Sequence, residues 1–102
     1  MAQFDVYRRS FTRDPDIVGI VSLQSDLLRQ TKTTVIAPLR RPGSTPLIDR
    51  LTPVFELNGE RLIFSPAEVA SISTRLLGPP VANLASERDR IIAALDVLFT
   101  GI

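Results

Sequence analysis

The pair Asn58-Gly59 is the strongest constraint on how this 102-residue chain can fold, because alternating residues flank it on both sides. Asn-Gly is the preferred pair for a two-residue type I′ turn, whose twist matches that of two antiparallel strands. A turn there pairs opposite charges with each other and apolar residues with each other. The predicted pairs are Glu56 with Arg61, Phe55 with Leu62 and Val54 with Ile63. Residues 53–64 are therefore predicted to form a β-hairpin.

Several other short stretches have the composition of β-strands. They alternate apolar and polar residues or are rich in β-branched residues, and loops with proline and glycine separate them. Ser65, Pro66 and Glu68 have the spacing of a capping box with proline at the first helical position, so residues 65–71 predict a helical turn. The predicted strands are residues 2–8, 17–25, 33–39 and 71–77, and the predicted long loops are residues 10–16 and 40–49.

One long helix is predicted over residues 86–102, with Ser86 as its N-cap. Apolar residues recur along it at helical spacing, and we expect this stripe to pack on the sheet. Gly101 is expected to fray the end of the helix. The stripe consists of Ile91, Leu95, Leu98 and Ile102, widened by Ile92 and Phe99.

These elements predict a single α+β domain over residues 1–102, without repeats or linkers. Many short strands in this length suggest a small, strongly twisted, barrel-like antiparallel sheet that carries a C-terminal α-helix. A sheet this small leaves edges and apolar surface to cover, so we expect a dimer.

The composition removes several classes of function. The chain has no cysteine and no histidine, so disulfides, cysteine-based metal sites and the usual general base near neutral pH are all absent, and neither a metal nor a cofactor is expected. Its net charge of +1 gives no electrostatic case for direct binding of nucleic acid, so a protein partner is favoured. No stretch has the length of a signal peptide or a membrane span, which predicts a cytoplasmic protein.

Two short motifs remain open to two interpretations each. Arg40 and Arg41 are adjacent in a proline- and glycine-containing segment, where they form either an anion or RNA grip or a solvated basic loop. Leu27 and Leu28 stand in a connection between strands, where two leucines either anchor the connection in the core or contact a partner.

The final stretch, residues 98–102, raises the same choice. Packing in the core accounts for Leu98 and Phe99 but not for Gly101 followed by Ile102. Glycine lets a backbone approach another surface closely, and a terminal carboxylate supplies a charge. The end of the helix is therefore either a core anchor or a partner-binding tip.

Five segments together resemble the CcdB toxin family in order and spacing. They are "QFDVY", "VSLQSDLL", "TTVIAPL", "LTPVFELNGE" and "LFTGI". The resemblance covers nearly the whole chain, and differences in length fall in the loops around residues 9–16 and 40–50. It implies a homodimer of barrel-like sheets related to the SH3-like fold of the MazF toxins, each with a long C-terminal helix.

The resemblance also implies a function. Members of the family are toxins of plasmid and chromosomal toxin–antitoxin modules that bind the A subunit of DNA gyrase while it holds cut DNA, and they block resealing. The toxin is not an enzyme. A short antitoxin neutralises it through a segment that folds on binding, and the pair reaches operator DNA through the antitoxin. The residues of this chain that contact the antitoxin are not predicted.

In the family the end of the helix, Trp-Gly-Ile, binds gyrase, assisted by apolar residues after "QSD". This chain departs at Thr100, which replaces a tryptophan whose ring stacks on a gyrase arginine, and loss of such a residue typically costs about 2 to 4 kcal/mol of binding. Two alternatives therefore stay open: a homologue that binds only its antitoxin, and a MazF-like endoribonuclease. The resemblance assigns gyrase binding to Leu27, Leu28, Asp96, Phe99, Thr100, Gly101 and Ile102.

Overall fold

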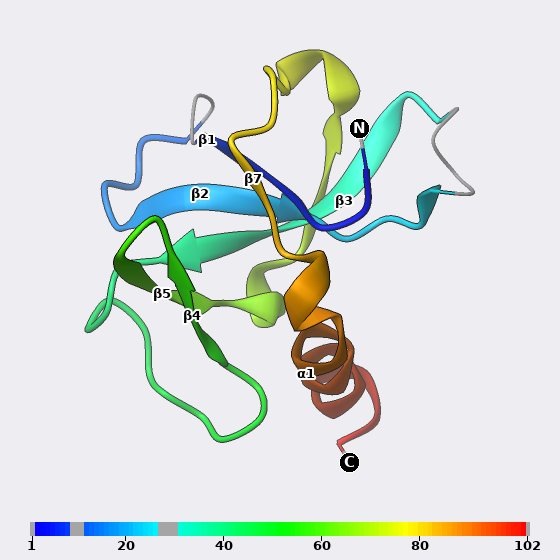
Figure 1. Cartoon of the computed structure of the whole chain (residues 1–102). Coiled ribbons are helices and arrows are strands. Elements are labelled where there is room, and N and C mark those ends of the chain that lie inside the picture. The colour runs from blue at the N-terminus through cyan, green and yellow to red at the C-terminus, as the bar shows by residue number, and fades with distance from the viewer. Residues whose placement is uncertain (1, 9–11, 27–30, 102) are drawn as a thin grey trace.

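A computed structural model describes residues 2–8, 12–26 and 31–101 of the chain (Figure 1). The described residues form a strongly bent antiparallel sheet of seven strands with one α-helix beneath it, which confirms the predicted α+β, barrel-like class. The elements are β1 (Asp5–Arg8), β2 (Ile17–Ser22), β3 (Thr33–Arg40), β4 (Val54–Leu57), β5 (Glu60–Phe64), β6 (Ala70–Ser73), β7 (Ala82–Asn83), the 3₁₀ turns η2 (Pro66–Glu68), η3 (Thr74–Leu76) and η4 (Ala85–Glu87), and α1 (Arg88–Thr100).

Strand β3 organises the sheet. Its whole second half pairs with β2, whereas its other edge is shared: Leu39 and Arg40 pair with β5, and residues 33–36 pair with β6. Because β5 and β6 pair with different parts of the same edge of β3, the sheet bends between these two strands. The chain then crosses to the far side, where β7 pairs with β1. The sheet is therefore nearly closed.

The predicted hairpin is confirmed with its register. Asn58 and Gly59 both have positive φ, at 53° and 82°, as a type I′ turn requires. The pairs across β4 and β5 are Val54 with Ile63, Phe55 with Leu62 and Glu56 with Arg61, all as predicted.

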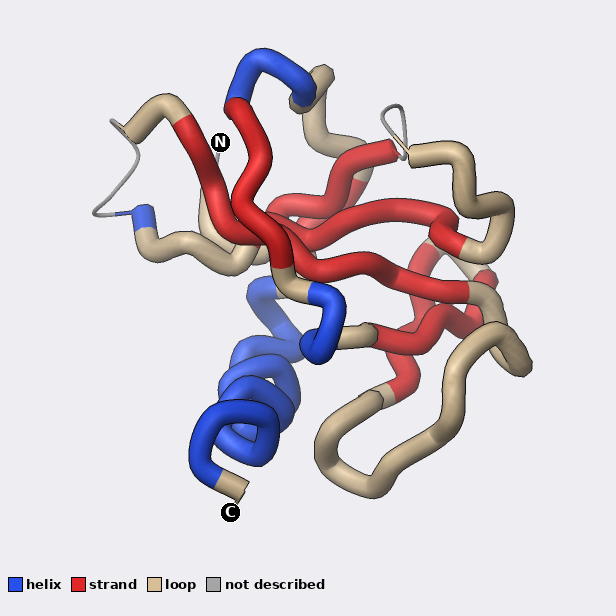
Figure 2. Tube along the Cα trace, turned by 180° about the vertical axis from the view of Figure 1, so that it is seen from behind, coloured by secondary structure: helices blue, strands red, loops and turns tan. Residues whose placement is uncertain are grey.

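Both faces of the sheet are buried, because alternation along each strand sends neighbouring residues to opposite sides. On β1, Val6 joins the larger core and Tyr7 joins the smaller one. The larger core lies between the sheet and α1 and includes Ile91 and Ala94 of the helix. Figures 1 and 2 show the result from opposite sides: α1 lies under the sheet, and its far end projects away from the strands.

Gly19 allows β1 and β2 to approach closely at an irregularity of the sheet. The register between β2 and β3 shifts between Ile17 and Gly19, as in a β-bulge. A Cβ atom on Gly19 would lie 2.9 Å from the carbonyl oxygen of Tyr7, which is closer than two such atoms can approach. Only glycine fits there.

Arg40 joins three segments that are far apart in the sequence. Its guanidinium donates Nε and Nη2 to the two carboxylate oxygens of Glu68, at 2.6 Å each, and Nη1 lies 3.1 Å from Oδ2 of Asp14. Ser65 donates its hydroxyl to the same carboxylate at 2.8 Å. Arg41 donates to the carbonyl of Pro15 at 3.2 Å. The interpretation of the pair as a solvated loop is therefore wrong for Arg40, which ends β3 and is mostly buried, whereas Arg41 is exposed in the loop that follows.

Two predicted helix starts differ in detail. The turn after the hairpin is the 3₁₀ helix η2, in which the Glu68 side chain pairs with Arg40 and the Ser65 side chain makes no cap bond, so no capping box forms. Ser86 is not the N-cap of the long helix, because it lies inside η4, and α1 begins after Glu87. Asn83 caps this region instead, accepting the Ala85 N–H at 2.7 Å.

Gly19→Ala is expected to lower the free energy of unfolding by about 1 to 3 kcal/mol, because the added methyl group must push two paired strands apart. Urea denaturation measures the change. Gly78→Ala is the matched control, since a Cβ atom there meets nothing within 4 Å, and it should change stability by about 0.5 kcal/mol at most. Equal effects of the two substitutions would contradict the close approach.

Glu68→Gln is expected to lower the free energy of unfolding by about 0.5 to 1 kcal/mol at pH 7, since the half-exposed ion pair with Arg40 is lost. The hydrogen bonds from Arg40 lower the pKa of Glu68 below its ordinary 4.5, so its contribution is present above that value and disappears as pH falls through the folded pKa. Denaturation between roughly pH 7 and pH 3 should show the two proteins converging. The exposed Glu60→Gln serves as control, and a constant gap at all pH values would refute the ion pair.

Candidate functional site

The helix α1 is anchored along its first half and free at its end. Ile91 and Ala94 are fully buried against the sheet. Further along, Leu95 and Leu98 are only half-buried, and Phe99 is 71% exposed. The predicted stripe therefore packs on the sheet only in its first turns. The end of the helix was predicted to be either a core anchor or a partner-binding tip. Phe99 does not anchor it in the core, because its side chain is exposed.

Three of the predicted site residues share one face at this end. Asp96, Phe99 and Thr100 stand at positions i, i+3 and i+4, which are neighbours on a helix surface, and all three are exposed. Gly101 follows directly and is also exposed. The fold thus brings four of the seven predicted residues together into one surface, the helix tip (Asp96, Phe99, Thr100 and Gly101).

The side chain of Thr100 is held by its own helix. Its hydroxyl donates a hydrogen bond of 2.6 Å to the carbonyl oxygen of Asp96, one turn earlier. This bond satisfies the hydroxyl and fixes the rotamer. Thr100 therefore adds a small, ordered side chain to the helix tip and no aromatic face.

Gly101 ends α1 with a defined cap rather than by fraying, so the expectation of a frayed end is wrong. Its φ of 75° is the left-handed conformation that glycine adopts without strain, and its N–H donates to the carbonyl of Val97 at 2.9 Å. A Cβ atom at this position would meet nothing within 4 Å. The glycine is explained by backbone conformation, and the space around it is open.

The helix tip is electronegative. The last turn of α1 carries no basic side chain, and Asp96 adds an exposed carboxylate to the negative end of the helix dipole. An exposed aromatic ring beside negative charge attracts a guanidinium or ammonium group, through its face and through the carboxylate together. The tip is thus suited to a partner surface that presents an arginine or lysine.

The other three predicted residues, Leu27, Leu28 and Ile102, lie outside the described residues. The described residues on either side of the Leu27–Leu28 connection are joined, because Gln24 donates to the hydroxyl oxygen of Thr31 at 2.7 Å. Figures 1 and 2 place these flanking segments and the helix tip on different sides of the molecule.

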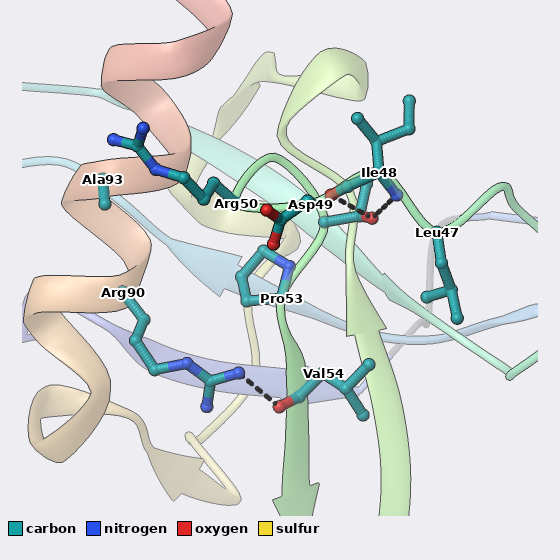
Figure 3. A pocket seen from close by; sticks show the side chains of 9 residues that line it. Leu47, Ile48, Asp49, Arg50, Pro53, Val54, Arg90 and Ala93 are labelled. Atoms are coloured by element: carbon teal, nitrogen blue, oxygen red, sulfur yellow. Dashed lines mark hydrogen bonds between the residues drawn. The ribbon is translucent and has the colours of Figure 1, made fainter. Parts of the chain in front are cut away.

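Sequence reasoning missed a second surface. Leu47 and Ile48, in a loop predicted without function, are 68% and 49% exposed, and they line a hollow of about 400 Å³ beside α1 (Figure 3). The available signal was two adjacent large apolar residues inside a polar, proline-containing loop. Such a pair is unusual where nothing covers it.

The shifted titratable groups of the described residues have structural causes. Burial raises the pKa of the Tyr7 phenol, and the nearby Asp5 carboxylate raises it further. The Glu68 carboxylate raises the pKa of Arg40, and Arg40 lowers that of Glu68. Within the described ranges, no group of acidic residues has the geometry of a metal site, and α1 is too short and too polar to cross a membrane. These groups offer no acid–base pair at the helix tip.

Two comparisons with known proteins bear on the identity of the chain. A search among curated proteins finds no match to the chain. The model of one protein family, described as "CcdB protein", matches residues 3–101 and so covers both the sheet and the helix tip. On this match across almost its whole length, the chain belongs to the CcdB family.

Proposed function

We propose that this protein is a toxin that inhibits DNA gyrase by binding its A subunit through the helix tip and blocking the resealing of cut DNA. Membership of the CcdB family supports a toxin of a toxin–antitoxin module. The observation that carries the finer assignment is Phe99, a large apolar side chain left 71% exposed at an electronegative helix end. An exposed aromatic of this kind is typical of a binding hot spot.

The anchoring of α1 supports binding rather than catalysis. A helix of 13 residues, held at Ile91 and Ala94, presents its last turn in a fixed orientation. Pre-organisation lowers the entropy lost on association, so a small surface can bind tightly. The toxin itself performs no chemistry in this proposal, and it acts in the cytoplasm, where gyrase works.

Thr100 sets the strength of this interaction. The methyl and hydroxyl groups of threonine cannot stack on a guanidinium, and the hydroxyl is already bonded to Asp96. Phe99 is then the aromatic face available at the tip for a gyrase arginine. We propose that Phe99 and Asp96 carry the contact and that Thr100 makes it weaker than a tryptophan would.

An antitoxin is the second proposed partner. A short protein with an extended segment would neutralise the toxin by folding onto it. The net charge of +1 supports a protein that reaches operator DNA only through this antitoxin.

A homodimer is the proposed assembly. Several large apolar side chains outside α1 are exposed to water. Among them are Val35 on β3 and Val81 just before β7, at 38% and 43% exposure. Among the described residues, the strand order also ends at β4 and β7, and each of these pairs with one neighbour only. Both features favour contact with a second copy.

A gyrase cleavage assay with supercoiled plasmid and gyrase from the source organism tests the helix tip. The wild-type protein is expected to trap linear DNA, and Gly101→Arg is expected to abolish trapping, since a charged side chain enters the contact. Thr100→Trp is expected to trap at concentrations at least about 30-fold lower, because it restores an aromatic hot spot worth about 2 to 4 kcal/mol, and each 1.4 kcal/mol changes affinity about tenfold.

Gly43→Arg is the matched control for Gly101→Arg. Gly43 has a φ of 88° and open space around it, so the substitution adds the same charge and the same backbone strain away from the tip. It should trap DNA like the wild type. If only Thr100→Trp traps DNA, or if Gly101→Arg traps as well as Gly43→Arg, the proposed function of the native tip is wrong.

Sedimentation equilibrium tests the assembly. At micromolar concentration the protein is expected to have twice the mass of the 102-residue chain. A dimer would bury exposed apolar side chains and cover open strand edges, which lowers the free energy of the pair. A monomer at all concentrations up to about 100 times that range would rule out the homodimer.

A further inference from the structure

Two arginines stand in the first turn of α1, where the helix dipole does not favour them. The N-terminal end of a helix carries a partial positive charge, which acidic side chains stabilise and basic side chains destabilise. Asp89 follows this rule, whereas Arg88 and Arg90 oppose it. The stability of the helix by itself therefore gives no reason for two arginines here, and their contacts with the rest of the fold supply one.

Arg88 joins the helix to the N-terminal segment of the chain. Its guanidinium carbon lies 5.8 Å from the centre of the Phe4 ring, and its Nη1 donates to Oε1 of Gln3 at 3.3 Å. Both partners are themselves held in place. The Phe4 N–H donates to the carbonyl of Ser22 at 2.7 Å. The Gln3 side chain donates to the carbonyl of Leu23 at 3.1 Å, so Arg88 is attached to an ordered part of the fold.

Arg90 joins the same turn of the helix to a different strand. Its guanidinium carbon lies 4.9 Å from the centre of the Phe55 ring on β4, and its Nη2 donates to the carbonyl of Val54 at 2.9 Å (Figure 3). Its Nη1 lies 3.3 Å from a carboxylate oxygen of Glu87, at the end of η4. Because β4 pairs with β5 along the hairpin, this second contact also attaches the helix to the sheet.

The two arginines lie on opposite flanks of the buried stripe of the helix. Ile91 and Ala94 mark the face that packs on the sheet. Successive residues of an α-helix are about 100° apart around its axis, so Arg88 lies about 90° to one side of the midpoint of this face and Arg90 about 70° to the other. The aromatic rings under both guanidinium groups are buried in the larger core. The arginines therefore hold the helix from both sides at the rim of one core.

Contacts at the base of the helix control the position of its far end. Phe99 lies about 13 Å along the axis from Arg90, at about 1.5 Å per residue, and a tilt of about 10° at the base would move it sideways by about 2 Å. A recognition surface has to be held within about 0.5 Å of its productive geometry. Apolar packing is non-directional, so it opposes separation from the sheet more than swinging across it. Hydrogen bonds and cation–π contacts on both flanks oppose swinging.

We propose that Arg88 and Arg90 are positioning residues, which hold α1 from both flanks and set the direction in which the helix tip projects. They act through the helix and do not themselves contact gyrase. The inference deepens the proposed function, and it rests on that function only for the partner that the tip meets. The orientation of the tip is a property of the free protein, so it is measurable without gyrase.

Electron paramagnetic resonance distances between two spin labels test the orientation. The chain has no cysteine, so Asp96→Cys on the helix tip and Ser71→Cys on β6 carry the only labels. Excess unlabelled protein removes distances between two copies of the chain. Arg88→Met/Arg90→Met keeps much of the apolar stems and removes the cations and donors. It is expected to broaden the distance distribution by about 2 Å or more, the displacement that a tilt of about 10° gives.

Three comparison proteins separate positioning from loss of stability. Gly19→Ala is expected to destabilise the fold with both arginines in place, and it should keep the narrow distribution. Arg75→Met, at an exposed position on η3, should also keep it. Arg88→Lys/Arg90→Lys retains a cation over each ring and should remove about half of the broadening or more. A narrow distribution in the methionine double variant, a broad one in Gly19→Ala, or no narrowing with lysine would overturn the proposal.

The single variants Arg88→Met and Arg90→Met keep the test decisive if the double variant does not fold. Each removes the contact on one flank and leaves the other, so each should give a distribution of intermediate width. Urea denaturation of the same samples verifies that they are folded under the conditions of the distance measurement. Two folded single variants with the wild-type width would overturn the proposal.

The gyrase cleavage assay separates this inference from the proposed function. Arg88→Met/Arg90→Met should need about tenfold more protein than the wild type, or more, to trap linear DNA, because the tip is less pre-organised. Arg75→Met should trap DNA as the wild type does. Trapping by the double variant at the wild-type concentration would overturn the inference. Weaker trapping with an unchanged distance distribution would also overturn it, because the arginines would then contact gyrase themselves.

Failure of the proposed function has a different outcome. A wild type that does not trap DNA would contradict gyrase poisoning. The distance measurement would still decide whether the two arginines orient the helix, because it uses the free protein.

Discussion

The shared edge of β3 is the constraint on which the rest of the structure depends. Because β5 and β6 pair with different halves of one edge, the sheet must bend between them, and the chain closes the other side through β7 and β1. The close approach of β1 and β2 at Gly19 and the Arg40–Glu68 ion pair both sit on this frame. The bend creates the concave face that holds the larger core.

That core decides where α1 can go. Ile91 and Ala94 are buried in it, and the sheet is too small to cover a helix of 13 residues along its whole length. The last turn therefore projects with Phe99 exposed. A binding tip and a stable fold are compatible here because each uses a different part of the helix: the first half contributes buried area, and the second half contributes exposed surface.

Arg40 and Arg90 have the same side chain but different surroundings in the fold. Arg40 has two carboxylate partners and ties three segments together. Arg90 donates to the carbonyl of Val54 at the edge of β4, lies over the Phe55 ring and pairs with the partly buried Glu87. The sequence places Arg40 beside Arg41 before a proline and Arg90 inside the predicted helix, but it does not show which partners either residue has. Burial and the choice of partner separate them.

Local chemistry made much of the fold predictable. Asn58-Gly59 determined the hairpin and its register, and apolar spacing located the one long helix. The start of that helix was not predictable from Ser86, because the exit from β7 and the Asn83 cap decide it. Within the candidate site, Phe99, Asp96 and Thr100 are neighbours by helical spacing alone. Their exposure was not predictable, because it depends on how far the sheet reaches.

By itself, the sequence determined the hairpin and the one long helix, the absence of histidine and cysteine chemistry, and a resemblance to a toxin family that the family match bears out. Only the tertiary structure decided that Arg40 forms ion pairs with distant segments, that Phe99 faces water, and that Leu47 and Ile48 line a hollow beside α1. The reason is physical. Turn and helix propensities act between residues a few positions apart, whereas burial and ion pairing depend on segments that folding brings together from opposite ends of the chain.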